Sequence, residues 1–387
     1  MPRVRLKPLS RQTIVITGAT SGIGLATARM AAERGAAVVL TARNEDALRR
    51  LAEEIRGRGG RAEYRAADVA DQMQVDAVAA KAVEAFGGFD SWVNDAGAFI
   101  YGRMEDVSLA DQRRLFDVTY WGVVHGTLAA ARHLRDRGGA IVNLGSVLGD
   151  RAIALQGPYC AAKAAVKNAT DAFRMEFEGE GLPISVTLIK PGPVDTPFME
   201  HARNAMGTKG TRNPPPAYHP RVAARAILHA CETPVRDLYV GAAGWLTSLA
   251  GALAPRLTDY AMEALAKPTQ ATDDPGRAER RDNLYEPKED LSERSSLGGP
   301  RPRGRSLLLD AQMNPGKTAA VAVAGLAAAA LGAALAGAGA PASARRLGHG
   351  RRWYRPAGAR GVVPPSKSAV RPRDGAALAA GVPLPRG

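Results

Sequence analysis

Three closely spaced glycines near the N-terminus, Gly18, Gly22 and Gly24, constrain the fold of this chain more than any other sequence feature. They follow residues 13–17, a β-branched run that is typical of a buried strand. Good helix formers occupy residues 25–34 after them. Glycines on a strand-to-helix turn let backbone N–H groups and a helix N-terminus approach a phosphate closely. The segment therefore predicts a dinucleotide-binding turn, in preference to a turn whose glycines serve packing alone.

A second motif lies in the middle of the chain, where Tyr159 and Lys163 are four positions apart. Residues 159–178 have helical character, so both side chains are expected on one face of a helix. A free phenol has a pKa near ~10, and a nearby ammonium favours the phenolate and lowers that pKa. Ser146 ends the predicted strand 140–146 and can donate a hydrogen bond to a substrate oxygen. The group predicts proton exchange with an alcohol oxygen while a nicotinamide exchanges hydride; the alternative is an exposed helical Tyr–Lys pair.

The order and spacing of these motifs resemble the short-chain dehydrogenase/reductase family over residues 10–266, with a C-terminal extension. The resemblance implies a doubly wound parallel α/β sheet of about seven strands with helices on both faces, which the alternating strand-like and helical stretches also favour. It implies catalytic roles for Ser146, Tyr159 and Lys163, the last two also touching the cofactor. Further cofactor contacts are implied for Thr17, Gly18, Ser21, Gly22, Ile23, Gly24, Asp68, Val69, Asn94, Ala96, Gly97, Pro191, Gly192, Val194 and Thr196. For Asn94 the implied role is mainly structural.

The end of the second predicted strand bears on the choice of cofactor. An NAD site usually carries an acidic residue there, which binds the ribose 2′-hydroxyl. Here Ala42 and Arg43 follow the apolar run 37–41. An acid would repel a 2′-phosphate, whereas arginine offers it a planar cationic fork. We therefore expect NADP(H) in preference to NAD(H); the alternative is that Arg43 begins a solvated helical turn.

Two positions depart from the family pattern. Thr119 stands where the family has a fourth catalytic residue, an asparagine that helps to hold a water linked to the lysine. Asp95 replaces the second asparagine of an Asn-Asn-Ala-Gly pattern. Thr119 is kept as a candidate catalytic residue, because a hydroxyl can also hold a water. It also favours an alternative function, a nucleotide-binding sensor or scaffold that has lost turnover on the same fold.

The substrate region is expected in residues 197–220, which glycines and prolines interrupt. In the family that this chain resembles, the lid over the substrate lies there. Phe198, Met199, Met206 and Tyr218 are candidates for an apolar pocket, the alternative being scattered surface side chains. The expected substrate is a small molecule, a secondary alcohol or ketone with apolar bulk.

The C-terminal third changes in composition. Residues 267–316 are rich in charge, proline, serine and glycine, which predicts a linker. Residues 317–344 are mostly alanine, glycine, leucine and valine, and are long enough for a candidate membrane-anchor helix; the alternative is a low-complexity segment. Residues 345–387 form a basic, Pro/Arg-rich tail that is expected to be disordered.

Charge and cysteine usage exclude several classes of protein. Most of the net charge of +14 lies in the basic tail, so we expect no nucleic-acid partner for the folded domain. The two cysteines form no metal spacing, and no metal site is expected. The N-terminus shows no secretory signal, so we expect a cytoplasmic enzyme, with membrane attachment only through the C-terminus. The resemblance implies a homo-oligomer.

Overall fold

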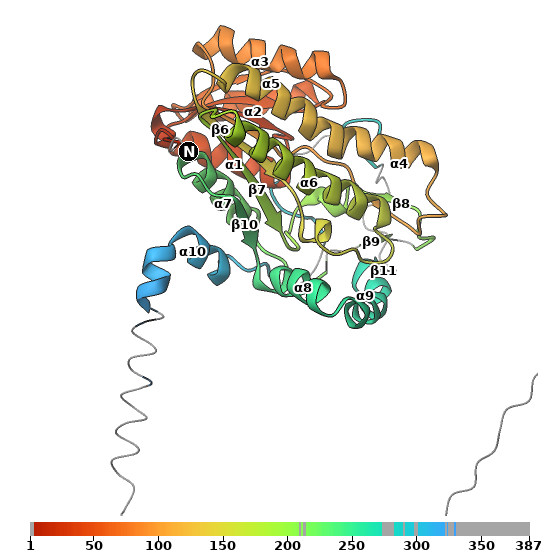
Figure 1. The fold of residues 1–387 in the computed structure, drawn as a ribbon. Helices are drawn as coiled ribbons and strands as arrows, with labels where there is room; N and C mark the ends of the chain where they lie inside the picture. The colour runs from red at the N-terminus through yellow and green to blue at the C-terminus, as the bar shows by residue number, and fades with distance from the viewer. Residues whose placement is uncertain are drawn as a thin grey trace, which may run out of the picture. The chain divides into compact units, whose positions relative to one another are not determined.

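The computed structural model describes residues 4–208, 210–211, 214–272, 282–288, 291–297, 301–321, 323 and 329. Its centre is a seven-stranded sheet in the order β10-β7-β6-β4-β1-β2-β3 (Figure 1). Every neighbouring pair is parallel, which confirms the predicted doubly wound sheet. The strands are β1 Thr13–Thr17, β2 Ala37–Thr41, β3 Arg61–Tyr64, β4 Ser91–Asn94, β6 Gly139–Leu144, β7 Ile184–Pro191 and β10 Asp237–Val240.

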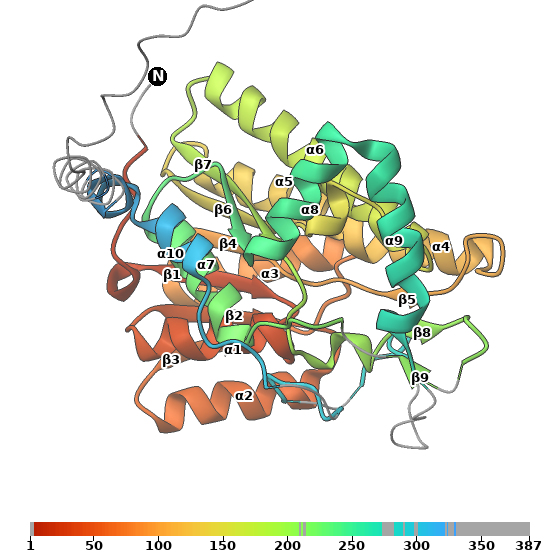
Figure 2. The ribbon, with the colours of Figure 1, turned by 90° about the horizontal axis from the view of Figure 1, so that it is seen from below.

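Helices cover both faces of the sheet (Figures 1 and 2). One apolar cluster joins the sheet to α1, α2 and α7 through side chains such as Leu25, Leu48 and Ile227. The other joins it to α3, α5 and α6. Because both faces are covered, β1 and β2 are buried along their whole length. The helices are α1 Gly22–Glu33, α2 Glu45–Gly57, α3 Gln72–Phe86, α4 Leu109–Phe116, α5 Gly122–Leu134, α6 Gly157–Gly179 and α7 Pro220–Glu232.

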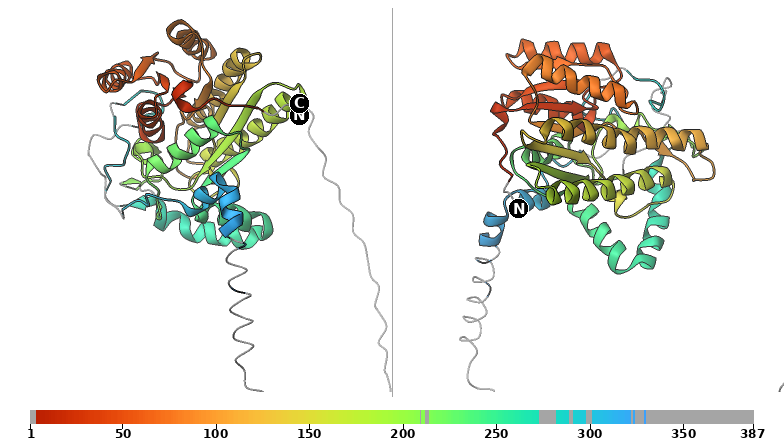
Figure 3. Two further views of the ribbon diagram at one scale, coloured as in Figure 1. Left: turned by 90° about the vertical axis from the view of Figure 1, so that its left-hand side faces the viewer. Right: turned by 45° about the horizontal axis from the view of Figure 1, so that its top comes forward.

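Short elements and two further helices complete the domain. The helices α8 and α9, drawn in teal in Figure 3, follow β10 and meet at an angle at Ala254. In the predicted substrate region, β8 pairs with β5 and β9 pairs with β11. These elements are β5 Ile100–Tyr101, β8 Arg203–Asn204, β9 Gly210–Thr211, β11 Ala271–Thr272, η1 Leu9–Arg11, η2 Asp117–Trp121, η3 Val147–Gly149, η4 Pro197–Met199, α8 Ala242–Leu253 and α9 Pro255–Gln270.

The third strand is shorter than its sequence suggests. Residues 63–69 are expected to form the third strand, but β3 begins at Arg61 and ends at Tyr64. Asp68 and Val69 therefore lie in the loop that follows. The sheet order reverses between β1 and β4, so the loops after these two strands separate and leave a crevice at the carboxyl ends of the strands.

The described parts of residues 267–316 do not form a linker, contrary to the prediction from composition. Leu284 is 1% exposed and Leu309 is fully buried. The helix α10 Leu307–Met313 packs against β10, where the Gln312 side chain bonds both the N–H and the carbonyl of Tyr239 at 3.0 Å. This polar segment thus packs on the folded domain through a few side chains such as Leu284, Leu309 and Gln312. The average composition of the segment does not reveal these contacts.

Residues up to Ala324 form one compact unit, and residue 329 alone represents the unit that follows. Most of the candidate anchor 317–344 and the whole basic tail 345–387 lie outside the described residues. Within the part of the chain that the structure describes, no helix is both long and apolar enough to cross a membrane.

Candidate active site

The glycine turn lies at the crevice between β1 and β4. Gly18 and Gly22 have φ angles of +70° and +54°, which residues other than glycine rarely adopt. A Cβ on Gly24 would lie 2.3 Å from the carbonyl oxygen of Gly18. The three glycine positions therefore leave the backbone of the turn open to a ligand, and the N-terminus of α1 begins within the turn at Gly22. These features fit a pyrophosphate group.

The end of β4 is fastened to this turn. The Thr17 hydroxyl accepts hydrogen bonds from the N–H groups of Asp95 and Ala96 at 3.0 and 3.1 Å. Asn94 is 2% exposed, accepts from Trp92 Nε1 at 2.7 Å and donates to Asn143 Oδ1 at 2.8 Å. Asn94 thus ties β4 to β6 below the crevice, which is a structural role.

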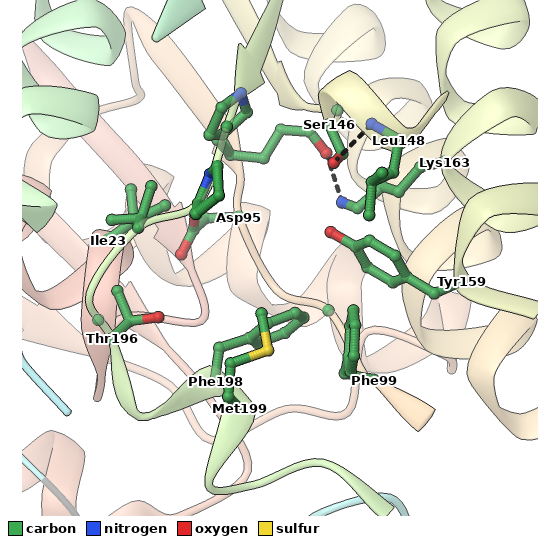
Figure 4. A pocket seen from close by; sticks show the side chains of 18 of the residues that line it. Ile23, Asp95, Phe99, Ser146, Leu148, Tyr159, Lys163, Thr196, Phe198 and Met199 are labelled. Atoms are coloured by element: carbon green, nitrogen blue, oxygen red, sulfur yellow. Dashed lines mark hydrogen bonds between the residues drawn. The ribbon is translucent and has the colours of Figure 1, made fainter. Parts of the chain in front are cut away.

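Ser146, Tyr159 and Lys163 line one cavity of about 220 Å³ (Figure 4). Ser146 follows β6 and caps η3 by accepting a hydrogen bond from Leu148 N at 3.1 Å. Tyr159 and Lys163 come from the same face of α6, and the Lys163 Nζ lies 5.8 Å from the centre of the Tyr159 ring. The helical pair Tyr159 and Lys163 and the strand-end residue Ser146 thus lie on one wall of the cavity.

Burial sets the proton affinities of this group. It raises the pKa of Tyr159 above the ordinary value of a phenol, and the hydrogen bond with Ser146 only opposes this in part. Burial lowers the pKa of Lys163 to about 8, and its Nζ donates to the carbonyl of Leu144 at 2.6 Å. The expectation of a lowered Tyr159 pKa is wrong for this structure, because loss of solvent outweighs any help from the ammonium. The phenol is protonated at neutral pH.

Asp95 is a site residue that the motifs did not identify as functional. It lines the cavity, and burial raises its pKa to about 7, against the opposing charge of Lys163 and a hydrogen bond from Gly24 N–H. Its departure from the family's asparagine was visible in the sequence. Its position beside the glycine turn required the structure.

Thr119 does not line the cavity. It lies in the π-helical turn η2 and is fully buried. Its hydroxyl accepts from Ala98 N–H at 3.1 Å and lies 3.4 Å from the carbonyl oxygen of the same residue. The hydroxyl is therefore engaged in holding the segment that follows β4.

The opposite wall of the cavity is formed by the turn after β7 and an apolar group. Phe198 and Met199 line it as expected, whereas Met206 and Tyr218 do not. Phe99 also lines it, with its ring 4.4 Å from that of Tyr159. No motif marks Phe99, which reaches the cavity from the position just before β5. The predicted cofactor residues on the cavity are Gly18, Ser21, Gly22, Ile23, Gly97, Tyr159, Lys163, Pro191, Gly192, Val194 and Thr196.

The remaining predicted cofactor residues do not line this cavity; they are Thr17, Gly24, Arg43, Asp68, Val69, Asn94 and Ala96. Arg43 donates hydrogen bonds to the carbonyl oxygens of Leu284 and Tyr285, at 3.3 and 2.9 Å, and to that of Asn283. The half of the crevice beyond the glycine turn is therefore covered by the C-terminal part of the chain.

A parallel doubly wound sheet with a glycine turn at its reversal point, next to Ser146, Tyr159 and Lys163, defines a class of dinucleotide-binding oxidoreductases. The family model described as short chain dehydrogenase matches residues 12–207. The chain belongs to the short-chain dehydrogenase/reductase family.

Several curated relatives are oxidoreductases. The uncharacterized oxidoreductase YxnA of Bacillus subtilis is 43% identical over 328 residues, covering 84% of this chain and 92% of its own length. The 2,5-dichloro-2,5-cyclohexadiene-1,4-diol dehydrogenase LinX of Sphingobium indicum is 36% identical, covering 49% of this chain and 76% of its own. The cis-4-hydroxycyclohexanecarboxylate dehydrogenase of Sinomonas cyclohexanicum is 38% identical with the same coverage.

Solved structures share the domain. A short chain dehydrogenase/reductase from Burkholderia phymatum in complex with NAD has a TM-score of 0.58 at 26% identity, covering 66% of this chain and 96% of that one. An alcohol dehydrogenase from Thermococcus sibiricus complexed with 5-hydroxy-NADP has a TM-score of 0.52 at 27% identity, covering 59% and 95%.

Proposed function

We propose that the protein is an NADP(H)-dependent oxidoreductase that transfers hydride between the nicotinamide and a secondary alcohol or ketone. The observation that carries this proposal is the shared cavity, which Ser146, Tyr159 and Lys163 line on one side and the glycine turn borders on another. Bound nicotinamide would supply or accept the hydride. The protein's own residues would bind the substrate oxygen and exchange its proton.

Tyr159 is the proposed general acid and base. Because its pKa is raised by burial, the protonated phenol suits donation of a proton to a carbonyl oxygen that is being reduced. Ser146 would donate a hydrogen bond to the same oxygen as negative charge develops on it. Lys163, with a pKa of about 8, would hold positive charge close to the phenol and favour its deprotonated state after transfer.

Arg43 supports the preference for NADP(H). It follows β2 at the place where an NAD site usually carries an acid, and the cavity of about 90 Å³ beside it is also lined by Thr20, Ser21 and Lys288. The Arg43 guanidinium and the hydroxyls of Thr20 and Ser21 suit the 2′-phosphate of NADP(H).

The substrate is proposed to be a ring alcohol or cyclic ketone. Phe99, Phe198 and Met199 form an apolar wall below the Tyr159 hydroxyl (Figure 4), which favours an apolar body next to the reacting oxygen. The names of the Sphingobium and Sinomonas relatives describe dehydrogenases of six-membered ring alcohols. A homo-oligomeric state and membrane attachment through the C-terminus remain predictions.

The test is oxidation of NADPH by the full-length protein with cyclohexanone and substituted cyclohexanones, followed at the nicotinamide absorbance. Tyr159→Phe is expected to lower turnover by about 10²–10⁴-fold while the dissociation constant for NADPH stays within about twofold, because the ring still packs against Phe99. Cofactor binding without turnover in the native protein would instead support the nucleotide-sensing alternative. Full activity of the Tyr159→Phe variant would remove Tyr159 from the mechanism.

A further inference from the structure

We propose that residues 282–288, here called the strap, occupy the adenosine half of the cofactor crevice and compete with the dinucleotide for it. Cofactor binding then requires the strap to leave. The inference rests on the proposed function, because it requires the crevice to bind a nicotinamide dinucleotide.

The first contact that the strap shares with a cofactor is Arg43. Its two terminal nitrogens donate to three successive main-chain carbonyls, those of Asn283, Leu284 and Tyr285. A 2′-phosphate would need these same donors. Carbonyl oxygens and phosphate oxygens cannot accept from them in the same place at the same time.

The second contact is apolar. The Leu284 side chain is 1% exposed and belongs to the same buried cluster as Val69 and Leu115. Arg114 holds it there by donating from Nε to the Leu284 carbonyl at 3.0 Å, and it also pairs with Asp68. The loop of Asp68 and Val69 is the place expected for the adenine ring, and a buried leucine fills the space beside it.

A third contact lies at the glycine turn. The N–H of Gly22 donates to the carbonyl oxygen of Ser292 at 3.0 Å. This N–H is one of the donors at the start of α1 that a pyrophosphate would use. The residues just after the strap thus satisfy a phosphate-binding donor as well.

The strap is also anchored to the substrate side of the site. Asp282 pairs with Arg203 of β8, with Oδ2 3.1 Å from Nε, and Asn283 N–H donates to the carbonyl of His201 at 3.0 Å. His201 and Asn283 both line the main cavity. Displacement of the strap would therefore release the loop that carries Phe198, and would couple cofactor entry to the shape of the substrate pocket.

Only one half of the cofactor fits while the strap is in place. The nicotinamide half of the crevice is an open cavity, lined by the catalytic group and the turn after β7. In the adenosine half, Arg43 already donates to carbonyl groups of the strap, and Leu284 fills the apolar space beside Val69. The N–H of Gly22 already donates to the carbonyl of Ser292. If the strap covered a bound cofactor without competing with it, Arg43 and the loop of Asp68 and Val69 would be available to contact the cofactor. In this structure both instead contact the strap or its neighbour Arg114.

The test uses Leu284→Ser in the full-length protein, with Leu307→Ser as the matched control, because Leu307 is 75% exposed on α10. The dissociation constants for NADPH and NADH are measured by calorimetry. If the strap blocks most molecules, its release raises the apparent affinity in proportion to the unblocked fraction, so Leu284→Ser is expected to bind NADPH at least about threefold more tightly. The control is expected to bind like the native protein.

A second measurement needs no variant. Hydrogen exchange of the strap amides in the native protein is expected to speed up when NADPH is saturating, because the strap is displaced. Asp282→Asn, which weakens one anchor only, is expected to change affinity in the same direction as Leu284→Ser but less. Weaker or unchanged NADPH binding by both variants, or slower strap exchange with NADPH, would overturn the proposal. If neither the native protein nor any of the variants binds NADPH or NADH, the proposed function is wrong, and the strap proposal, which rests on it, is wrong as well.

Discussion

The guanidinium of Arg43 donates a hydrogen bond to the main-chain carbonyl of Tyr285 at 2.9 Å, so the residue after the second strand is held by the C-terminal part of the chain. The pairing also buries the guanidinium, and burial lowers the pKa of Arg43. The position that is expected to select the cofactor is therefore already engaged in the free protein.

Arg43→Asp tests the choice of cofactor. An acid would repel the 2′-phosphate and accept a bond from the ribose hydroxyls of NADH, and a hydrogen bond to a charged group contributes about 1.5–3 kcal/mol. The ratio of kcat/KM for NADPH to that for NADH is expected to fall by about 10–100-fold. Arg49→Asp, on the exposed side of α2, is the control and should leave the ratio unchanged. An unaltered ratio in the Arg43 variant would contradict the proposal that Arg43 selects NADP(H).

Gly24→Ala tests the backbone cradle. The added Cβ would lie 2.3 Å from the Gly18 carbonyl oxygen and 2.7 Å from Asp95 Oδ2, so the turn must deform. We expect a loss of about 1–3 kcal/mol in the free energy of unfolding and weaker NADPH binding. Gly57→Ala meets nothing within 4 Å in α2 and should stabilise the protein by about 0.5–1 kcal/mol. Urea unfolding measures the free energy of unfolding, and calorimetry measures the dissociation constant for NADPH. Equal changes in the two variants would contradict a turn that has no room for a side chain at Gly24.

Asp95→Asn tests the buried carboxyl near the catalytic group. Because burial raises its pKa from 3.8 to about 7, the native state binds this proton more tightly than the unfolded chain does. The free energy of unfolding therefore falls as pH rises through that range. Asparagine carries no such proton, so the variant is expected to gain on the order of 1–3 kcal/mol relative to the native protein between pH 4 and 8.

Urea unfolding at pH 4.5, 6 and 8 measures this gain. Asp136→Asn, at an exposed position, is the control and should show no pH-dependent difference. A difference between the Asp95 variant and the native protein that stays constant over these pH values would argue that Asp95 has an ordinary pKa.

Thr119→Val tests whether this hydroxyl is structural. Valine keeps the shape but leaves the buried N–H of Ala98 without its partner, which costs about 1–3 kcal/mol of stability. Thr247→Val, at a partly exposed position of α8, should change stability by less than about 0.5 kcal/mol. Thr119→Asn, which restores the family's residue, is expected to keep or raise turnover in the NADPH assay. A large loss of turnover in Thr119→Asn would show that threonine has a specific role here.

The convergence of Ser146, Tyr159 and Lys163 on one cavity was predictable because these residues are close in sequence or at strand ends. Tyr159 and Lys163 are one helical turn apart, and Ser146 follows a strand whose carboxyl end must face the crevice of a parallel sheet. Thr119 was harder to interpret, since the role of its hydroxyl depends on a buried partner from another part of the chain, Ala98. The pKa of Tyr159 was predicted in the wrong direction, because sequence shows its charged neighbour but not the loss of solvent around it.

The sequence by itself determined the sheet, the glycine turn and the family, since each is encoded by residues within one or two neighbouring elements. The tertiary structure alone decided what lies in the adenosine half of the crevice. Arg43 and the carbonyl of Tyr285 are 242 positions apart, and no local pattern in the polar segment after residue 266 indicates that Leu284 would be buried. Such long-range contacts depend on the shape and open donors of a folded surface, which exist only after the chain has packed.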